Sequence, residues 1–216
     1  MLSSVLVKNF EVGGAEFKVT VPFGSAATFH LDGTVDYKRH FAGATLRVEG
    51  SQPAPPPAEV FWNLTDVVEG IDGLSAELAA LGRPPAKYLA RPLTKTSTQD
   101  VVLNLVLATS AEQRDNPQLV QQGTARFLRT DAIGGAPVDV YRYGARTTYW
   151  VRKSDSLLMR VEADLAVATG TTVIDLVDHR AIEMTGPRRD DVVSAKDLPD
   201  EVIVRLTGVN ATVKGS

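Results

Sequence analysis

The feature that most constrains the fold is a run of strand-like segments between Val138 and Met184. In its clearest part, residues 156–165, apolar residues occupy every second position and only Leu158 breaks the pattern: Leu157, Met159, Val161, Ala163 and Leu165. A period of two is typical of a strand with one buried face. A β-branched and aromatic segment precedes this part, and a second strand pattern follows Gly170. The run therefore predicts an antiparallel meander whose apolar face must be covered by another layer.

Similar patterns predict further strands on both sides of the meander. On the N-terminal side they cover residues 5–21 with a turn at Gly13-Gly14, 29–37, 44–49 and 58–64. A strand at 126–128 precedes the meander, a short one at 181–184 ends it, and a closing edge strand is expected at 202–204.

The middle of the chain changes to helical spacing. Apolar residues of 71–81 fall on one helix face, and Gly82 ends the pattern. A second helix is expected to start near Ser97-Thr98, with Asp100 near its positive end. Its apolar residues, 101–107, surround nearly the whole helix, which indicates burial on all sides. A third, short helix is expected from Asn116-Pro117.

Strands, then helices, then strands indicate the α+β class, with helices on one face of a largely antiparallel sheet. We interpret residues 1–216 as a single domain, because 216 residues suffice for one large domain and the strand pattern resumes directly after the proline-rich loop 50–57.

Composition excludes several classes of function. The net charge of −3 and the pI of about 5.6 argue against nucleic-acid binding. No apolar run reaches the ~18 residues of a membrane span. The absence of cysteine excludes disulfides, thiolate metal sites and cysteine nucleophiles, and it leaves the cellular compartment open.

No catalytic or metal-binding motif is present. His30, His40 and His179 have no metal-ligand spacing, and the chain lacks nucleophile-elbow and phosphate-loop motifs. We therefore expect no catalytic residues, no metal and no cofactor, and a protein that is not an enzyme. The one catalytic alternative is His179 acting with Asp178, for which a turn residue is the simpler interpretation.

Two interpretations of the sheet and its apolar helix remain open. The core is close-packed, or sheet and helices enclose an apolar cavity. Both need the same apolar faces, so the pattern does not separate them.

The segment Tyr149–Val161 resembles a hairpin of the pattern "v-W-v-d-x-x-t-g-l-l-x-r". This pattern is the best match to actinobacterial cell-envelope lipoproteins of the LppX/LprAFG type, which the chain resembles and whose fold is related to the lipoprotein carriers LolA and LolB. Other matching segments lie in the family's order along residues 5–187: Phe29–Tyr37, Val60–Leu64, Asp115–Leu119, Gly134–Tyr141 and Thr185–Pro187.

The resemblance implies a curved, largely antiparallel half-barrel sheet wrapped around a few helices. It implies an apolar cavity that binds an acylated lipid or glycolipid, for lipid or lipoprotein transport or envelope homeostasis. It also implies a location on the extracytoplasmic face of the plasma membrane, with an anchor on an N-terminal cysteine. This chain has no cysteine, so either the sequence begins after that residue or the protein is not lipidated.

The expected lining of such a cavity comes from the apolar helix and the strands facing it: Trp62, Val102, Leu105, Val106, Trp150, Met159 and Val161. The alternative is a structural or protein-interaction module in which the same residues form a closed core.

Overall fold

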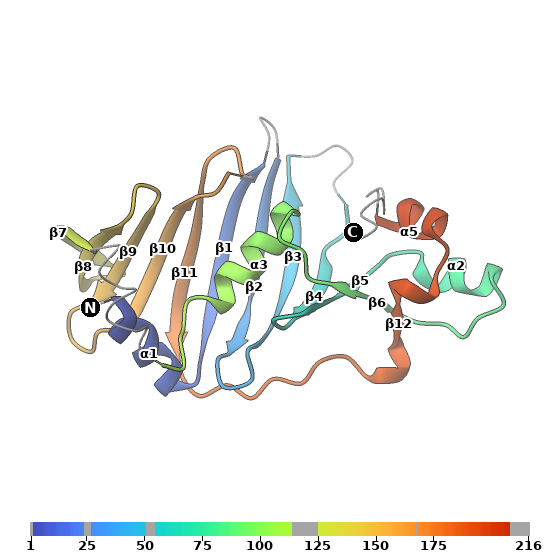
Figure 1. The fold of residues 1–216 in the computed structure, drawn as a ribbon, viewed down its shortest axis with the longest axis horizontal. Coiled ribbons are helices and arrows are strands. Elements are labelled where there is room, and N and C mark those ends of the chain that lie inside the picture. The colour runs from blue at the N-terminus through green and yellow to red at the C-terminus, as the bar shows by residue number, and fades with distance from the viewer. Residues whose placement is uncertain (1, 24–26, 51–54, 114–124, 167, 208–216) are drawn as a thin grey trace.

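The computed structural model describes residues 2–23, 27–50, 55–113, 125–166 and 168–207, which form one twelve-stranded sheet. The strand order is β12-β6-β5-β4-β3-β2-β1-β11-β10-β9-β8-β7, and the sheet stays open between its end strands β12 and β7 (Figure 1). Neighbouring strands are antiparallel except for the parallel pair β12 and β6. The strands are β1 Gly14–Phe23, β2 Ala27–Asp36, β3 Phe41–Glu49, β4 Ala58–Trp62, β5 Asp66–Gly70, β6 Tyr88–Pro92, β7 Arg126–Ile133, β8 Ala136–Tyr143, β9 Thr147–Arg152, β10 Leu158–Asp164, β11 Thr171–His179 and β12 Val192–Ser194.

The α-helices within the described residues lie in two places. Helix α3 (Thr98–Leu107) crosses one face of the sheet in front of β1–β3, and α1 (Leu2–Val12) lies beside it near β9 and β10 (Figure 1). Helices α2 (Leu74–Ala80) and α5 (Asp200–Thr207) pack at the β6–β12 end. Two 3-10 turns, Arg189–Asp191 and Ala195–Asp197, flank β12. Within these ranges, no helix combines the length and the apolar character needed to cross a membrane.

The two faces of the sheet differ in chemistry, as alternation requires. The face that carries α3, here called the helix face, presents apolar side chains such as Phe17, Leu31 and Leu176. The opposite, outer face carries cross-strand ion pairs, including Arg160 with Asp175 at 2.6 Å. The helix face therefore holds the main apolar core of the sheet.

The meander and most of the central strands agree with the sequence prediction. Strands β8 to β11 are sequential antiparallel neighbours within residues 136–179. The predicted helices correspond to α2, which ends before Gly82, and to α3, which begins after Ser97. Strands β5 and β6 had no clear sequence signal, because each is a five-residue strand with charged residues in its pattern.

Three predicted strands are wrong. Residues 2–12 form α1 rather than the start of a strand, and Gly13, with φ of 102°, ends this helix. Residues 200–207 form α5 rather than an edge strand. In both segments the apolar residues are adjacent in sequence, so they fit the spacing of a strand as well as that of a helix. Packing against the sheet selects the helix in residues 2–12, and packing against α2 selects it in residues 200–207.

The third wrong strand, residues 181–184, lies in a segment outside the sheet. It belongs to the connection from β11 to β12, which runs past the ends of β1–β3 (Figure 1). Met184 lies against Gly43 on the outer face, and its carbonyl accepts a 3.0 Å hydrogen bond from Arg39. The predicted short helix at Asn116-Pro117 lies outside the described residues.

Candidate functional site

The candidate site is the helix face around α3. The underside of the helix, formed by Val102, Leu103, Val106 and Leu107, belongs to the main apolar core together with strand residues such as Phe17. The indole N–H of Trp62 on β4 donates a 2.9 Å hydrogen bond to the backbone carbonyl of Leu103. This bond holds the middle of α3 directly against the sheet.

The first turn of α3 is fixed by a buried charge. Asp100 is fully buried, and both of its carboxylate oxygens accept hydrogen bonds from the guanidinium of Arg91 on β6, at 2.7 and 2.8 Å. Thr94 donates two further bonds to it, and Arg91 also contacts Glu69 at 2.8 Å. Burial alone would lower the pKa of Arg91, but the hydrogen bond to Asp100 and the two carboxylate charges outweigh it and raise that pKa.

The chain just after α3 is fixed by a second buried polar cluster. The side-chain amide of Asn9 on α1 donates to the carbonyl of Thr109 at 2.9 Å and accepts from the amide of Leu158 at 3.2 Å. The hydroxyl of Tyr37 lies 3.0 Å from that of Thr109. Burial raises the pKa of Tyr37 far above its usual value, although hydrogen bonds to Thr109 and Asn9 oppose this effect. Tyr37 therefore stays neutral.

The sequence analysis missed both polar clusters. Asp100 was interpreted as a favourable charge near the positive end of the helix, and Asn9 was placed in a strand. A sequence signal for Asp100 existed, because an acidic residue in an otherwise apolar helix needs a cation when it is buried. No comparable signal marked Asn9, since its partners lie 100 and 149 residues away.

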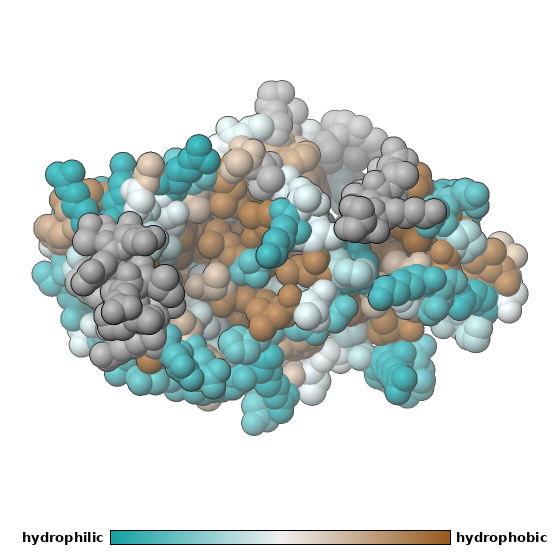
Figure 2. All heavy atoms as spheres, in the orientation of Figure 1, coloured by the Kyte–Doolittle hydropathy of each residue, from teal (hydrophilic) through white to brown (hydrophobic). Residues whose placement is uncertain are grey.

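Within the described residues, the helices bury the centre of this face and leave apolar residues around α3 half-buried. The ten residues of α3 extend about 15 Å. Hydrophobic side chains gather around α3 in the middle of this face, and hydrophilic side chains lie towards the outer border of the face (Figure 2). The partly buried hydrophobic residues that pack against the core there are here called the apolar margin: Leu6, Phe10, Phe29, Ala44, Leu46, Leu93, Leu105, Tyr141, Tyr149, Leu165 and Ala168.

Five of the seven predicted lining residues come together in this region. Trp62, Val102, Val106 and Val161 are buried in the core itself, and Leu105 belongs to the apolar margin. The expectation that α3 is buried on all sides is wrong, because Leu105 is half-buried and Asn104 is exposed. Only the underside of α3 meets the sheet.

Trp150 and Met159 do not belong to this group. They form a separate apolar cluster with Val138 and Val140 on the outer face. The pairing of β9 and β10 shifts between Leu158 and Arg160, and this bulge turns Leu158 rather than Met159 towards the main core. These two residues are therefore removed from the candidate lining.

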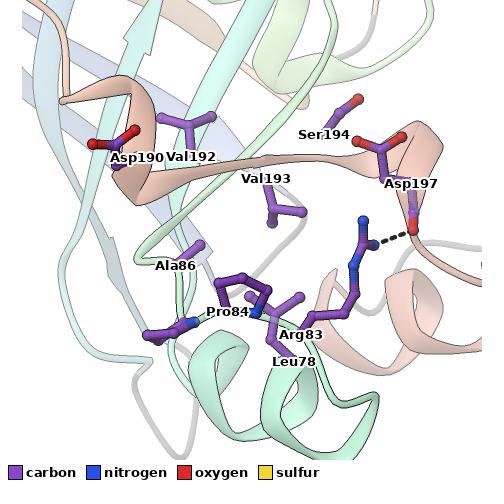
Figure 3. A pocket seen from close by; sticks show the side chains of 10 residues that line it. Leu78, Arg83, Pro84, Ala86, Asp190, Val192, Val193, Ser194 and Asp197 are labelled. Carbon is purple, nitrogen blue, oxygen red and sulfur yellow. Dashed lines mark hydrogen bonds between the residues drawn. The ribbon is translucent and has the colours of Figure 1, made fainter.

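The pockets that stand out lie away from α3. One, of about 230 Å³, is bounded by α2, β12 and the second 3-10 turn, with Leu78, Pro84 and Val193 at its apolar side (Figure 3). The guanidinium of Arg83 reaches across it to the carbonyl of Asp197. A second, of about 140 Å³, lies between α1 and the β8–β9 strands, beside Val5 and Tyr141. Neither contains any of the predicted lining residues.

Asp178 and His179, the alternative catalytic pair, are adjacent residues at the end of β11. Asp178 is exposed and pairs with Arg180, while His179 is half-buried. Burial lowers the pKa of His179, and the positive charge of Arg152 adds to this effect, although a backbone contact at Leu158 and nearby carboxylates oppose it. His179 therefore favours its neutral form. Within the described ranges, no group of three or more His, Asp or Glu side chains is placed to hold a metal ion.

Comparisons with known proteins found similarity only at the level of structure. No protein-family model and no curated protein matches this chain. An uncharacterised conserved protein from Thermus thermophilus is 8% identical, with 89% of this chain and 96% of that chain covered and a TM-score of 0.47.

Two further structures are similar to this chain at lower scores. A LolA superfamily protein from Nitrosomonas europaea is 11% identical, with coverages of 85% and 94% and a TM-score of 0.32. MucB in the MucA/MucB complex of Pseudomonas aeruginosa is 12% identical, with coverages of 81% and 55% and a TM-score of 0.34. All of these scores lie below 0.5, so they identify no family, and the LppX/LprAFG type stays a prediction.

Proposed function

We propose that this protein binds the acyl chain of a lipid or glycolipid on the helix face, along the apolar margin beside α3. The observation that carries the proposal is the pairing of a fixed helix with a partly open apolar surface. Asp100 and Asn9 fix α3 at its two ends, while Leu46, Leu105 and Tyr149 remain half-buried around it. An acyl chain laid along this surface would complete their burial.

Burial of only part of an acyl chain would contribute enough free energy for binding. Each methylene removed from water contributes about 0.8 kcal/mol. Half of a sixteen-carbon chain would thus contribute about 6 kcal/mol before the entropic cost of ordering the chain. The apolar margin needs no enclosed cavity for this, because one side of the ligand can stay in contact with solvent or with a membrane.

The proposed biological setting follows the sequence resemblance. A cell-envelope protein of the LppX/LprAFG type, on the extracytoplasmic face of the plasma membrane, would use this surface to carry or to sense an acylated lipid. Attachment through a lipidated cysteine upstream of residue 1 belongs to the same proposal. We propose no enzymatic activity.

A protein-interaction module is the second candidate, and one observation favours it. The underside of α3 meets the strands directly through Val102, Val106 and the Trp62–Leu103 hydrogen bond. The middle of the helix face is therefore closed, and the apolar margin would receive apolar side chains of a partner protein.

The test is binding of a fluorescent fatty-acyl probe, together with native mass spectrometry and solvent extraction of lipid from the purified protein. Leu105→Glu places a charge in the apolar margin at a half-buried position. We expect this variant to weaken probe binding at least about tenfold, since a carboxylate opposes transfer of the chain from water.

The matched control is Leu64→Glu, which changes a residue that is 56% exposed. It should bind the probe as the unchanged protein does, and circular dichroism should report folded protein for both variants. A protein that carries no extractable lipid and binds no probe would contradict lipid binding and favour the interaction module. Binding that Leu105→Glu leaves unchanged would place the ligand elsewhere.

A further inference from the structure

Strand β7 is the unprotected edge of the sheet. It pairs with β8 on one side, and within the described residues no backbone hydrogen bond reaches its other side. Residues 126–132 are all exposed, including Phe127 at 52% and Leu128 at 36%. Such an edge is a template for another strand.

The opposite edge of the sheet is built differently. Strand β12 has only three residues, and the two 3-10 turns, α2 and α5 pack around it. Short length and helical cover are common protections of edge strands. Strand β7 has eight residues and neither lysine nor proline, and its protective features are a bulge between Phe127 and Arg129 and three charged side chains.

The sequence of β7 is complementary to itself in antiparallel orientation. When two copies pair with Thr130 opposite Thr130, Arg129 of each lies opposite Asp131 of the other, and Leu128 lies opposite Ala132. Arg129 and Asp131 share one face, because they are two residues apart after the bulge, and their side chains already contact each other at 3.1 Å. Two copies would place four alternating charges on that face, with both arginines next to both aspartates.

We propose that two copies of this chain associate through their β7 edges, with residues 128–132 in this register, to form one continuous sheet. The backbone groups on the free side of β7 gain partners, and Leu128 of each copy loses contact with water. The bulge limits the paired length, so the dimer forms reversibly and depends on protein concentration.

Sedimentation analysis across a range of concentrations tests the interface through charge reversal. Arg129→Asp alone or Asp131→Arg alone places like charges opposite each other twice in the dimer. Each should raise the dissociation constant at least about tenfold. The double variant Arg129→Asp/Asp131→Arg restores opposite charges at every position and should restore dimerisation.

A single cysteine tests the register, since the chain has none of its own. Thr130→Cys places two thiols opposite each other across the twofold axis, and mild oxidation should give a covalent dimer. Ala132→Cys is the control, because its two copies would lie about 13 Å apart in this register. A protein that is monomeric at millimolar concentration overturns the proposal. So does a dimer that the single charge reversals leave intact, or equal cross-linking of both cysteine variants.

Discussion

Asp100 is the residue on which the position of α3 against the sheet most depends. Its side chain is fully buried, so its charge is tolerated only because Arg91 and Thr94 together donate four hydrogen bonds to it. A carboxylate in such a place fixes the helix in one position, whereas apolar contacts alone would allow it to slide.

Asp100→Asn should therefore destabilise the protein strongly. Removing the charge leaves Arg91 short of a partner in a partly buried site, and we expect the free energy of unfolding to fall by about 2–4 kcal/mol. Urea denaturation measures this change. Asp32→Asn is the control, since Asp32 pairs with Arg47 on the outer face where solvent screens the pair, and it should cost less than about 1 kcal/mol. Equal losses would show that the Asp100 cluster does not fix the helix.

His179 provides a test of acid sensitivity. Burial lowers its pKa in the folded state below the unfolded value of about 6.5. As pH falls through about 6.5, the unfolded chain binds a proton more readily than the folded one, so stability declines. Thermal unfolding from pH 7.5 to 5.5 should show a smaller decline for His179→Gln than for the unchanged protein. Parallel declines would contradict this assignment.

At the scale of elements, hydrogen bonds join α1 to the chain that directly follows α3. Asn9 joins them to β10 through its bonds to Thr109 and Leu158, and the amide of Ala111 donates a 3.1 Å hydrogen bond to the carbonyl of Leu6. The position of one helix on the helix face therefore depends on the other.

Asn9→Ala should loosen both helices together. It leaves two buried backbone groups without partners, at an expected cost of about 2–4 kcal/mol. Hydrogen exchange should show faster exchange in α1 and at the end of α3, with β1 and β2 less affected. Asn104→Ala, at an exposed position of α3, is the control and should be neutral or slightly stabilising. Faster exchange in α1 alone would contradict the coupling of the two helices.

At the scale of the whole molecule, one long sheet carries three separate apolar clusters. The main core lies under α1 and α3, a second joins α2, α5 and β6, and the third is the outer-face cluster of Trp150 and Met159. The second cluster is small and lies at one end of the sheet. We expect it to open at a lower free energy than the main core.

Leu78→Ala tests this local opening. Leu78 is 1% exposed in the second cluster, and its truncation should cost about 2–4 kcal/mol. Hydrogen exchange should then accelerate in α2, β6, β12 and α5 before it changes in β1 or β10. Leu81→Ala, at a position that is 41% exposed, should have little effect. Acceleration throughout the sheet would mean that the molecule opens as one unit.

The sequence by itself determined the strands of the meander within residues 136–179 and the helices α2 and α3. Residues 136–179 alternate because one face of each strand is buried, and the apolar residues of α2 and α3 have helical spacing. Only the structure shows that α3 packs on one side. These patterns are local, so they can be recognised without knowing what each element touches. The same patterns also placed five of the seven predicted lining residues on one face.

Only the tertiary structure decided the remaining features. Residues 2–12 and 200–207 became helices because packing partners select between two periods that both fit their short apolar runs. The bulge in β10 moved Met159 to the outer face, since one shifted residue reverses the alternation. The contacts of Asn9 and the partial burial of the residues around α3 depend on residues far apart in the chain, and local patterns carry no information about such distances.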